Sequence, residues 1–236
     1  MARRRIVITG GTDGIGLELA RRLAGRHDVM VTGRRSGKLA AALLPPSVHY
    51  VQADQEQPEQ AATDLARGLL KAGWTRLDHA VLNAATGHAC APAAETPALI
   101  AETLAVNLLA PVLQARVLRP ALKRTGGTLT FVGSVARNGA PQFATYAASK
   151  AALHGLARAL RSEWQDEIAV QVIHPGPTRT AMHAKAGHDP GRAGRLFLDA
   201  ADMAAMMEHA IASRRSPQTL GWLRYLAGGT LLGPRL

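Results

Sequence analysis

The chain has very few sulfur and aromatic side chains. Its single cysteine, Cys90, excludes an internal disulfide and a cysteine-based metal cluster. Aromatic residues make up 4% of the chain and hydrophobic residues 47%, so a substantial core must be built from Ala, Leu, Val and Ile. No run approaches the roughly 20 apolar residues of a membrane span. These absences favour a soluble, cytoplasmic protein that does not enter a membrane.

Acidic residues are also scarce, which leaves a formal net charge of +11. Such a charge can attract nucleic acid, a membrane surface or acidic small molecules. The Lys and Arg residues are scattered, however, and no basic stripe interleaved with aromatics or known nucleic-acid motif is present. We therefore expect no nucleic-acid partner, and we interpret most of the arginines as a solvated face. His154, His174, His183 and His188 lack the spacing of a metal site, and no metal is predicted.

Short apolar runs alternate with longer helical patterns along the chain. Six runs are rich in β-branched residues and end in turn residues, which is typical of buried strands: 5–10, 28–33, 48–53, 77–84, 127–134 and 168–176. Helical spacing separates them over 14–25, 55–73, 96–124 and 145–167. This alternation predicts an α/β fold. We expect residues 1–236 to form one Rossmann-type domain, with a doubly wound parallel sheet of about seven strands and helices on both faces.

The segment 178–199 breaks this alternation, because it is rich in Gly, His and Arg and has no clear period. A long connection of this kind is often a lid or a binding loop. A surface excursion with a short helix is the other interpretation. We expect a substrate loop here, and Met182, Leu196 and Phe197 could line an apolar site within it.

The first predicted strand leads directly into the glycine-rich turn "TGGTDGIG" and then into a helix. Glycines at this point allow a sharp turn, a close approach of the backbone to a pyrophosphate, and close packing of the helix on the sheet. The helix N-terminus then offers free N–H groups to phosphates. The turn predicts a dinucleotide site that includes Gly10, Thr12, Asp13, Gly14, Ile15 and Gly16.

The end of the second predicted strand indicates which dinucleotide binds. An acidic residue there would accept a hydrogen bond from the adenosine ribose and repel a 2′-phosphate. The chain instead has Arg34 and Arg35, whose planar guanidinium groups suit a phosphate. NADP(H) is therefore favoured, and NAD(H) stays an alternative because Asp13 places a carboxylate in the glycine turn.

Six motifs in register make the chain similar to the classical short-chain dehydrogenases/reductases, over nearly its whole length. They are "TGGTDGIG", "LNAA" (82–85), Val106-Asn107, Ser134, "YAASK" (146–150) and "PGPTRT" (175–180). "LNAA" departs from the NNAG motif of that family but retains Asn83. "LGWLRYLAGG" (220–229) likewise departs from the TGxxxxVDGG ending of the family, and we expect a seventh strand near 222–226.

The resemblance implies a catalytic set of Asn107, Ser134, Tyr146 and Lys150. Tyr146 would exchange a proton with the substrate oxygen, and Ser134 would hydrogen-bond that oxygen. Lys150 lies one helical turn after Tyr146, and its cation would lower the phenol pKa from about 10 towards neutrality. Asn107 would hold a water that links Lys150 to solvent.

The resemblance also assigns further cofactor contacts. Lys150 would bind the nicotinamide ribose, and Asp54 would lie beside the adenine. The other implied cofactor-binding residues are Asn83, Ala84, Tyr146, Pro175, Gly176, Thr178 and Thr180.

The implied function is an NADP(H)-dependent oxidoreductase that interconverts a small ketone or aldehyde with an alcohol. A ketoreductase acting on a carrier-bound or acidic substrate is an alternative that the net charge of +11 would favour. A non-catalytic NADP-binding scaffold protein is the third. A homodimer or homotetramer is expected.

Overall fold

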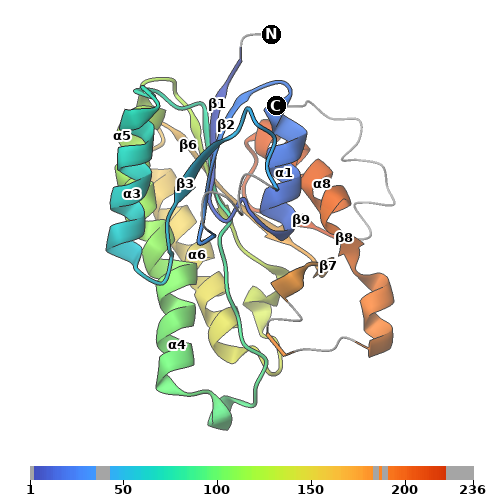
Figure 1. The fold of residues 1–236 in the computed structure, drawn as a ribbon. Coiled ribbons are helices and arrows are strands. Elements are labelled where there is room, and N and C mark those ends of the chain that lie inside the picture. Colours follow the sequence, from blue (N-terminus) through green and yellow to red (C-terminus); the bar gives the residue numbers. More distant parts are fainter. Residues whose placement is uncertain (1–2, 36–42, 183–185, 188–190, 222–236) are drawn as a thin grey trace.

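The computed structural model describes residues 3–35, 43–182, 186–187 and 191–221. A parallel sheet forms its middle layer, and helices cover both faces (Figure 1). The order across the sheet is β3-β2-β1-β4-β5-β6-β9. The strands are β1 (Arg5–Ile8), β2 (Asp28–Gly33), β3 (His49–Gln52), β4 (His79–Leu82), β5 (Thr128–Val132), β6 (Ala169–Pro175) and β9 (Gln218–Leu220). This confirms the predicted doubly wound α/β fold.

The order of the strands reverses between β1 and β4. From β1 the chain first builds outwards through β2 to β3, and it then returns to the other side of β1 with β4. The connections that leave β1 and β4 therefore run to opposite faces of the sheet. In open α/β sheets this leaves a crevice at the carboxyl ends of the two strands, where ligands bind.

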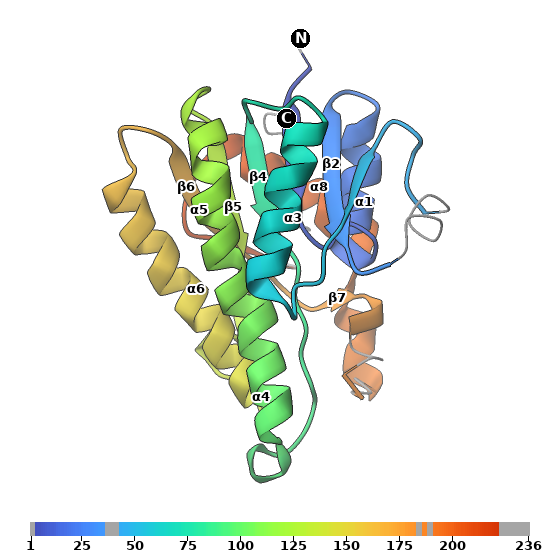
Figure 2. The ribbon, with the colours of Figure 1, turned by 60° about the vertical axis from the view of Figure 1, so that its left-hand side comes forward.

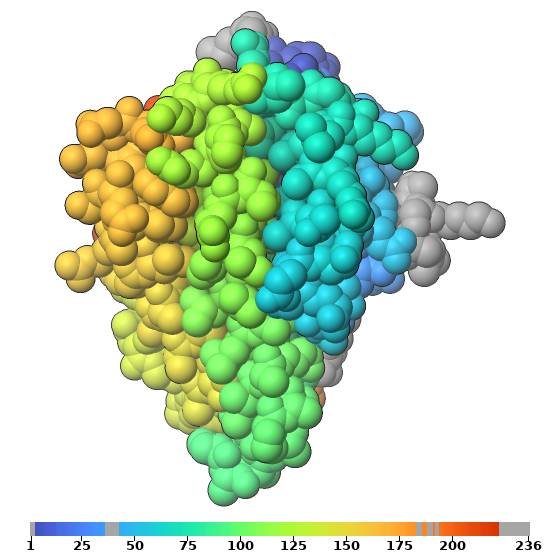
Figure 3. All heavy atoms as spheres, turned by 90° about the vertical axis from the view of Figure 1, so that its left-hand side faces the viewer, coloured from blue at the N-terminus to red at the C-terminus, as the bar shows by residue number. Residues whose placement is uncertain are grey.

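Each face of the sheet is covered by helices that bury an apolar side. On one face lie α3 (Pro58–Lys71), α5 (Ala110–Lys123) and α6 (Ala144–Glu163), which stand side by side in Figures 2 and 3. Their leucines and alanines pack on inward-facing strand residues such as Phe131. The other face is covered by α1 (Gly14–Ala24) and α8 (Ala200–Ser213). Two separate cores thus sandwich the sheet, and they contain few aromatics, as the composition predicts.

One long helical segment, Pro97–Lys123, changes its winding midway. It consists of α4 (Pro97–Leu104), the π-helix η2 (Ala105–Leu109) and α5. An 18-residue window of it has a mean hydropathy of 1.6, so by length and composition it could cross a membrane. The sequence alone did not show this, because charged residues interrupt the run. In the fold its α5 part packs on the sheet between α3 and α6 (Figure 2).

Two elements near the C-terminus differ from the sequence-based expectation. The helix α8 was not among the predicted helices, although its methionines and alanines are buried against α1 and the sheet. The seventh strand is β9, which pairs with β6. It precedes the predicted segment 222–226, which lies outside the described residues.

The remaining elements are short. Within 178–199, the two-residue strands β7 (Thr178–Arg179) and β8 (Leu198–Asp199) pair with each other, and a 3-10 turn, η4 (Gly191–Leu196), precedes β8. Two further 3-10 turns, η1 (Pro92–Ala94) and η3 (Val135–Asn138), lie in the connections after β4 and β5.

A buried carboxylate joins the two helices of the α1–α8 face. Glu208 of α8 has no exposed surface, and its two oxygens accept hydrogen bonds from Arg22 of α1 and from Arg26, which lies just after that helix, the latter at 2.8 Å. Burial raises the pKa of Glu208, but the hydrogen bonds and charges of Arg26 and Arg22 outweigh it and hold the pKa below its ordinary value. The ionised form therefore stabilises the fold.

Replacing Glu208 by Gln should lower the free energy of unfolding by about 1–3 kcal/mol at pH 7, because a charged acceptor of two hydrogen bonds is lost. A lowered folded-state pKa contributes stability above the unfolded pKa, which is lost on acidification. The difference between wild type and variant should therefore shrink as the pH falls through the carboxyl range. Urea unfolding at pH 7 and at low pH measures this.

Glu18→Gln on α1 is the matched control. Its exposed ion pair with Arg21 should contribute less than about 1 kcal/mol. Equal effects of the two substitutions would contradict the proposed role of the buried carboxylate.

Candidate functional site

A cavity of about 620 Å³ opens at the carboxyl ends of the strands. Most of the predicted site residues line it, which brings segments from the whole chain to one place. They are Gly10, Thr12, Asp13, Gly14, Ile15, Arg34, Arg35, Asp54, Asn83, Ala84, Ser134, Tyr146, Lys150, Pro175, Gly176, Thr178 and Thr180. Gly16 and Asn107 are not among the lining residues, although both contact residues that line the cavity.

The glycine turn lies where α1 meets the ends of β1 and β4. Gly10 has a φ of 66°, in the left-handed region that favours glycine. A Cβ on Gly16 would lie 2.3 Å from the Gly10 carbonyl oxygen and 2.6 Å from Asn83 Nδ2. Gly16 therefore allows the helix to pack closely, as the sequence predicts, and the first turn of α1 opens on the cavity.

Asn83 holds this turn with its side chain. Its Nδ2 donates to the backbone oxygens of Thr9, at 3.1 Å, and Gly10, at 3.3 Å. The Thr9 hydroxyl in turn accepts hydrogen bonds from the backbone N–H groups of Asn83 and Ala84. The side chain of Asn83 is thus used to tie β4 to the turn, and its neighbour Ala84 lines the cavity.

The two arginines that follow β2 both face carboxylates. Arg34 forms an ion pair with Glu56, and the Arg35 guanidinium lies 4.0 Å from Asp13. Asp13 is also the N-cap of α1, where its Oδ1 accepts a hydrogen bond from Gly14 N. These carboxylates hold both guanidinium groups at the rim of the cavity. Glu56 was missed by the sequence analysis, although it lies two residues after Asp54.

The segment that follows β6 forms another wall. Gly176 N donates to Leu220 O of β9 at 2.6 Å, and the Thr178 hydroxyl donates to Gly176 O at 3.0 Å. A Cβ on Gly14 would lie 3.1 Å from Thr180 Cγ2. The predicted residues of this segment therefore meet the glycine turn across the cavity.

Ser134, Tyr146 and Lys150 meet at the carboxyl end of β5. Ser134 follows this strand and is the N-cap of η3, where its Oγ accepts a hydrogen bond from Ala136 N at 3.1 Å. Tyr146 and Lys150 lie one turn apart on α6, with Lys150 Nζ 5.7 Å from the centroid of the phenol ring. Lys150 is only 2% exposed, and its ammonium donates to Val132 O at 3.0 Å.

The pKa values of the two residues on α6 are shifted by burial. Burial lowers the pKa of Lys150 to about 8, since it disfavours the charged ammonium. Burial also raises the pKa of the Tyr146 phenol, and a hydrogen bond from Ser134 opposes this. Lys150 is not among the causes of the Tyr146 shift, so the predicted lowering of that pKa by Lys150 is not seen here. The ammonium is directed at Val132 O and lies beside the ring rather than at the hydroxyl.

Asn107 lies in the π-helix η2 and is completely buried. Its Oδ1 accepts from Thr86 N at 2.8 Å, and its Nδ2 donates to Thr86 O at 2.8 Å and to Ser149 Oγ at 3.1 Å. Both amide hydrogens are thus used within the protein. A water held here, as the family resemblance implies, would have to donate to the second lone pair of Oδ1 or to the backbone carbonyl.

Two histidines lie behind Ser134. The His154 and His174 rings are 3.1 Å apart between Nδ1 and Nε2, and His174 is fully buried. Burial, followed by the charges of Arg137 and His154, lowers the pKa of His174 to about 4. Its ring fills the space beside Gly133, where a Cβ would lie 2.3 Å from Nδ1. The sequence spacing of these histidines did not indicate that they would pair.

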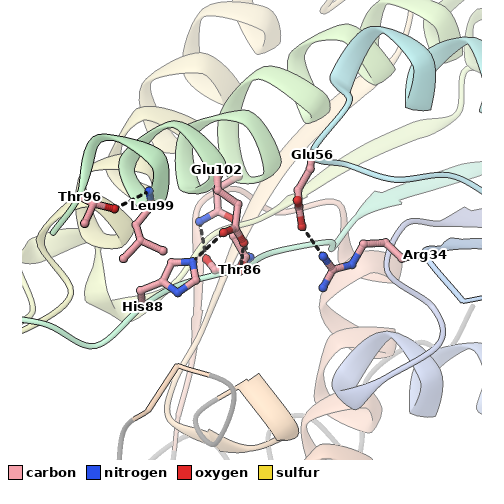
Figure 4. A network of polar contacts seen from close by, with 8 residues as sticks. Arg34, Glu56, Thr86, His88, Thr96, Leu99 and Glu102 are labelled. Atoms are coloured by element: carbon pink, nitrogen blue, oxygen red, sulfur yellow. Dashed lines mark hydrogen bonds and ion pairs between the residues drawn. The ribbon is translucent and has the colours of Figure 1, made fainter.

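The sequence analysis also missed a polar group on another wall of the cavity. Thr86, His88 and Glu102 all line it, and Figure 4 shows the first two directed at the carboxylate of the third. No sequence motif marks these residues, because Glu102 lies on α4 and the other two follow β4.

Comparison with known proteins shows the family of the chain. The family model "short chain dehydrogenase" matches residues 4–191. An uncharacterized oxidoreductase of Escherichia coli (strain K12), YciK, is 33% identical over 198 residues, which cover 78% of this chain and 77% of that protein. Human dehydrogenase/reductase SDR family member 4 is 31% identical, over 77% of this chain and 68% of its own length. The chain therefore belongs to the short-chain dehydrogenases, which are oxidoreductases.

Solved structures have the same fold. A short chain dehydrogenase from Burkholderia cenocepacia J2315, in complex with NADP, superimposes with a TM-score of 0.80 at 27% identity, covering 93% of this chain and 96% of that one. A blue fluorescent protein from a metagenomic library, in complex with NADPH, has a TM-score of 0.81 at 25% identity, over 92% of this chain and 96% of its own.

Replacing Lys150 by Met should change how stability depends on pH. The folded-state pKa of about 8 lies below the ordinary lysine value, so the unfolded chain binds more protons between these two values. Stability that depends on Lys150 therefore rises with pH in this window. The variant lacks this rise, so from pH 7 to pH 10 wild type should gain about 2 kcal/mol relative to it.

Urea unfolding of both proteins without added cofactor measures this difference, and other titrating groups cancel in the comparison. A difference that stays constant from pH 7 to pH 10 would contradict the lowered pKa.

Proposed function

We propose that this chain is an NADP(H)-dependent oxidoreductase that interconverts a ketone or aldehyde with an alcohol. The observation that carries the proposal is that one cavity collects three features: the glycine turn at the start of α1, the two rim arginines, and the group of Ser134, Tyr146 and Lys150. The NADP and NADPH complexes of the related structures support the choice of cofactor.

The residues present fit a phosphorylated dinucleotide. The cavity volume of about 620 Å³ lies within the range of small-molecule sites. Gly10 and Gly14 leave the turn open to a pyrophosphate, which the first turn of α1 would hold through its N–H groups. Arg34 and Arg35 would hold the 2′-phosphate, and Asp54 would contact the adenine.

When bound, the nicotinamide supplies or accepts the hydride. Tyr146 would transfer the proton to the carbonyl oxygen in the reductive direction, so that hydride and proton together convert the carbonyl to an alcohol. The raised pKa of Tyr146 keeps this proton on the phenol at neutral pH. The buried ammonium of Lys150 would stabilise the phenolate left behind, and Ser134 would hydrogen-bond the substrate oxygen.

Replacing Tyr146 by Phe should lower kcat for NADPH-dependent carbonyl reduction by about 10²–10⁴-fold, the usual contribution of a general acid. NADPH affinity should change much less, because the ring remains. Steady-state NADPH oxidation with a panel of ketones and aldehydes, together with calorimetric NADPH titration, measures both. Turnover by the variant that matches wild type would favour the non-catalytic scaffold.

Calorimetric titration should show that NADPH binds at least about tenfold more tightly than NADH, a difference of about 1.4 kcal/mol. The paired variant Arg34→Ala/Arg35→Ala should lose most of this preference, since its 2′-phosphate ligands are removed. Arg116→Ala, which removes an exposed charge on α5, is the control and should retain it. Tighter binding of NADH by wild type would overturn the cofactor assignment.

A further inference from the structure

The segment that follows β4 forms a fixed wall of the cavity. Ala89 N donates to Ala186 O at 2.8 Å, and Cys90 N donates to Gln142 O at 2.9 Å. The segment is therefore tied on one side to the predicted substrate loop and on the other to the turn before α6. Because backbone hydrogen bonds hold it at both sides, a side chain on this segment has a defined position in the cavity.

His88 is such a side chain, and Glu102 holds its ring. His88 Nε2 lies 3.1 Å from Glu102 Oε2, while the other oxygen of that carboxylate accepts a hydrogen bond from the Thr86 hydroxyl at 3.1 Å. Figure 4 shows both side chains reaching the carboxylate from the same segment. The imidazole and the carboxylate are each about three-quarters buried, with 23% and 25% of the side chain exposed.

This polar group lies next to the reacting groups. Gly87, between Thr86 and His88, packs against the phenol, since a Cβ there would lie 3.0 Å from Tyr146 Cδ2. The neighbouring cavity wall is apolar, with Ala140, Phe143, Met182 and Phe197. A substrate placed with its carbonyl at Tyr146 thus has mostly apolar surroundings and one polar wall.

The contact with Glu102 determines what His88 offers to a ligand. A carboxylate only accepts hydrogen bonds, so the hydrogen of a neutral imidazole resides on Nε2, and Nδ1 is an acceptor. Nδ1 makes no hydrogen bond with any residue that the structure describes. Of the other acidic lining residues, Glu56 and Asp13 face the two rim arginines, and Asp54 accepts a hydrogen bond from the backbone N–H of Glu56. Glu102 therefore supplies the negative charge of this wall.

We infer that His88, oriented by Glu102, is a specificity-determining residue that accepts a hydrogen bond from a hydroxyl group of the substrate. The preferred substrates are then hydroxylated ketones or aldehydes. A substrate with a carboxylate in place of the hydroxyl would be repelled by Glu102. Its carboxylate would also have no hydrogen to donate to Nδ1 of His88. This inference rests on the proposed carbonyl-reductase function and specifies its substrate class.

The test compares matched carbonyl compounds with NADPH. Each unsubstituted ketone, such as acetone, butanone and pentanone, is paired with analogues that have a hydroxyl at increasing distance from the carbonyl, and levulinate provides the carboxylate. Wild type should favour at least one hydroxylated analogue in kcat/KM by about tenfold, the scale of one hydrogen bond. The ratio of kcat/KM within that pair is the quantity compared among variants.

His88→Phe keeps a planar ring but removes the acceptor, and the ratio should fall to about one. His88→Asn retains an acceptor and should recover part of the preference. Glu102→Gln should lower the ratio and improve levulinate relative to pentanone, because the repelling charge is lost. Glu59→Gln, an exposed position on α3, should leave every ratio at the wild-type value. Thermal unfolding verifies that each variant is folded.

Two results would overturn the inference while leaving the proposed function intact. One is reduction of the ketones by wild type without preference for a hydroxyl at any distance, and the other is the same preference in wild type and His88→Phe. Failure of wild type to reduce any carbonyl compound, despite binding NADPH, would overturn both the inference and the proposed function.

Discussion

The backbone of Gly10 and Gly16 and the side-chain amide of Asn83 come so close together that no side chain on Gly16 would fit between α1 and the ends of β1 and β4. This contact sets the position of α1 at the point where the sheet order reverses. With the helix held there, its N-terminus faces the crevice, and the ends of the aligned strands together with α4 and α6 supply the other lining residues of the cavity. The Asn83 side chain bonds the glycine turn, and the cavity wall formed by Thr86, Gly87 and His88 follows soon after it in the chain, so one residue connects these two parts of the cavity.

The protein buries two charges in different ways. Glu208 accepts hydrogen bonds from two arginines, and such pairing is what allows a carboxylate to be buried. Among the residues that the structure describes, Lys150 has one hydrogen-bond acceptor, the Val132 carbonyl. Its lowered pKa indicates that burial of its charge is only partly compensated. An incompletely satisfied charge next to Tyr146 keeps its capacity to interact with a ligand. The first charge stabilises the fold, and the second reduces its stability, since burial disfavours the charged ammonium.

Periodicity in the sequence predicted the fold well because the parallel strands are buried on both faces and therefore appear as continuous apolar runs. It did not predict α8, since a helix of Met and Ala that is buried nearly all round has little amphipathic contrast. The glycine turn, the arginines and the residues of α6 could be predicted because each lies in a contiguous motif. The partners of these residues could not, since Glu56, Glu102 and the paired histidines reach the site from separate elements, and only the folded chain brings them together. Motifs likewise predicted a set of reacting groups but not their protonation, because the pKa shifts of Tyr146 and Lys150 arise from burial.

The π-helix η2 also determines which residues of α4 face the cavity. A single π turn amounts to one extra residue in an α-helix, and each residue turns an α-helix by about 100°. The side chains of α4 are thus rotated relative to α5 by that amount compared with an uninterrupted helix. This rotation presents Glu102 to His88 while Asn107 remains bonded to Thr86. The number of residues between Glu102 and Asn107 therefore determines which side chain of α4 faces the cavity. A relative with the same side chains but one residue fewer between α4 and α5 would keep Ser134, Tyr146 and Lys150 in place and present a different face of α4 to the cavity.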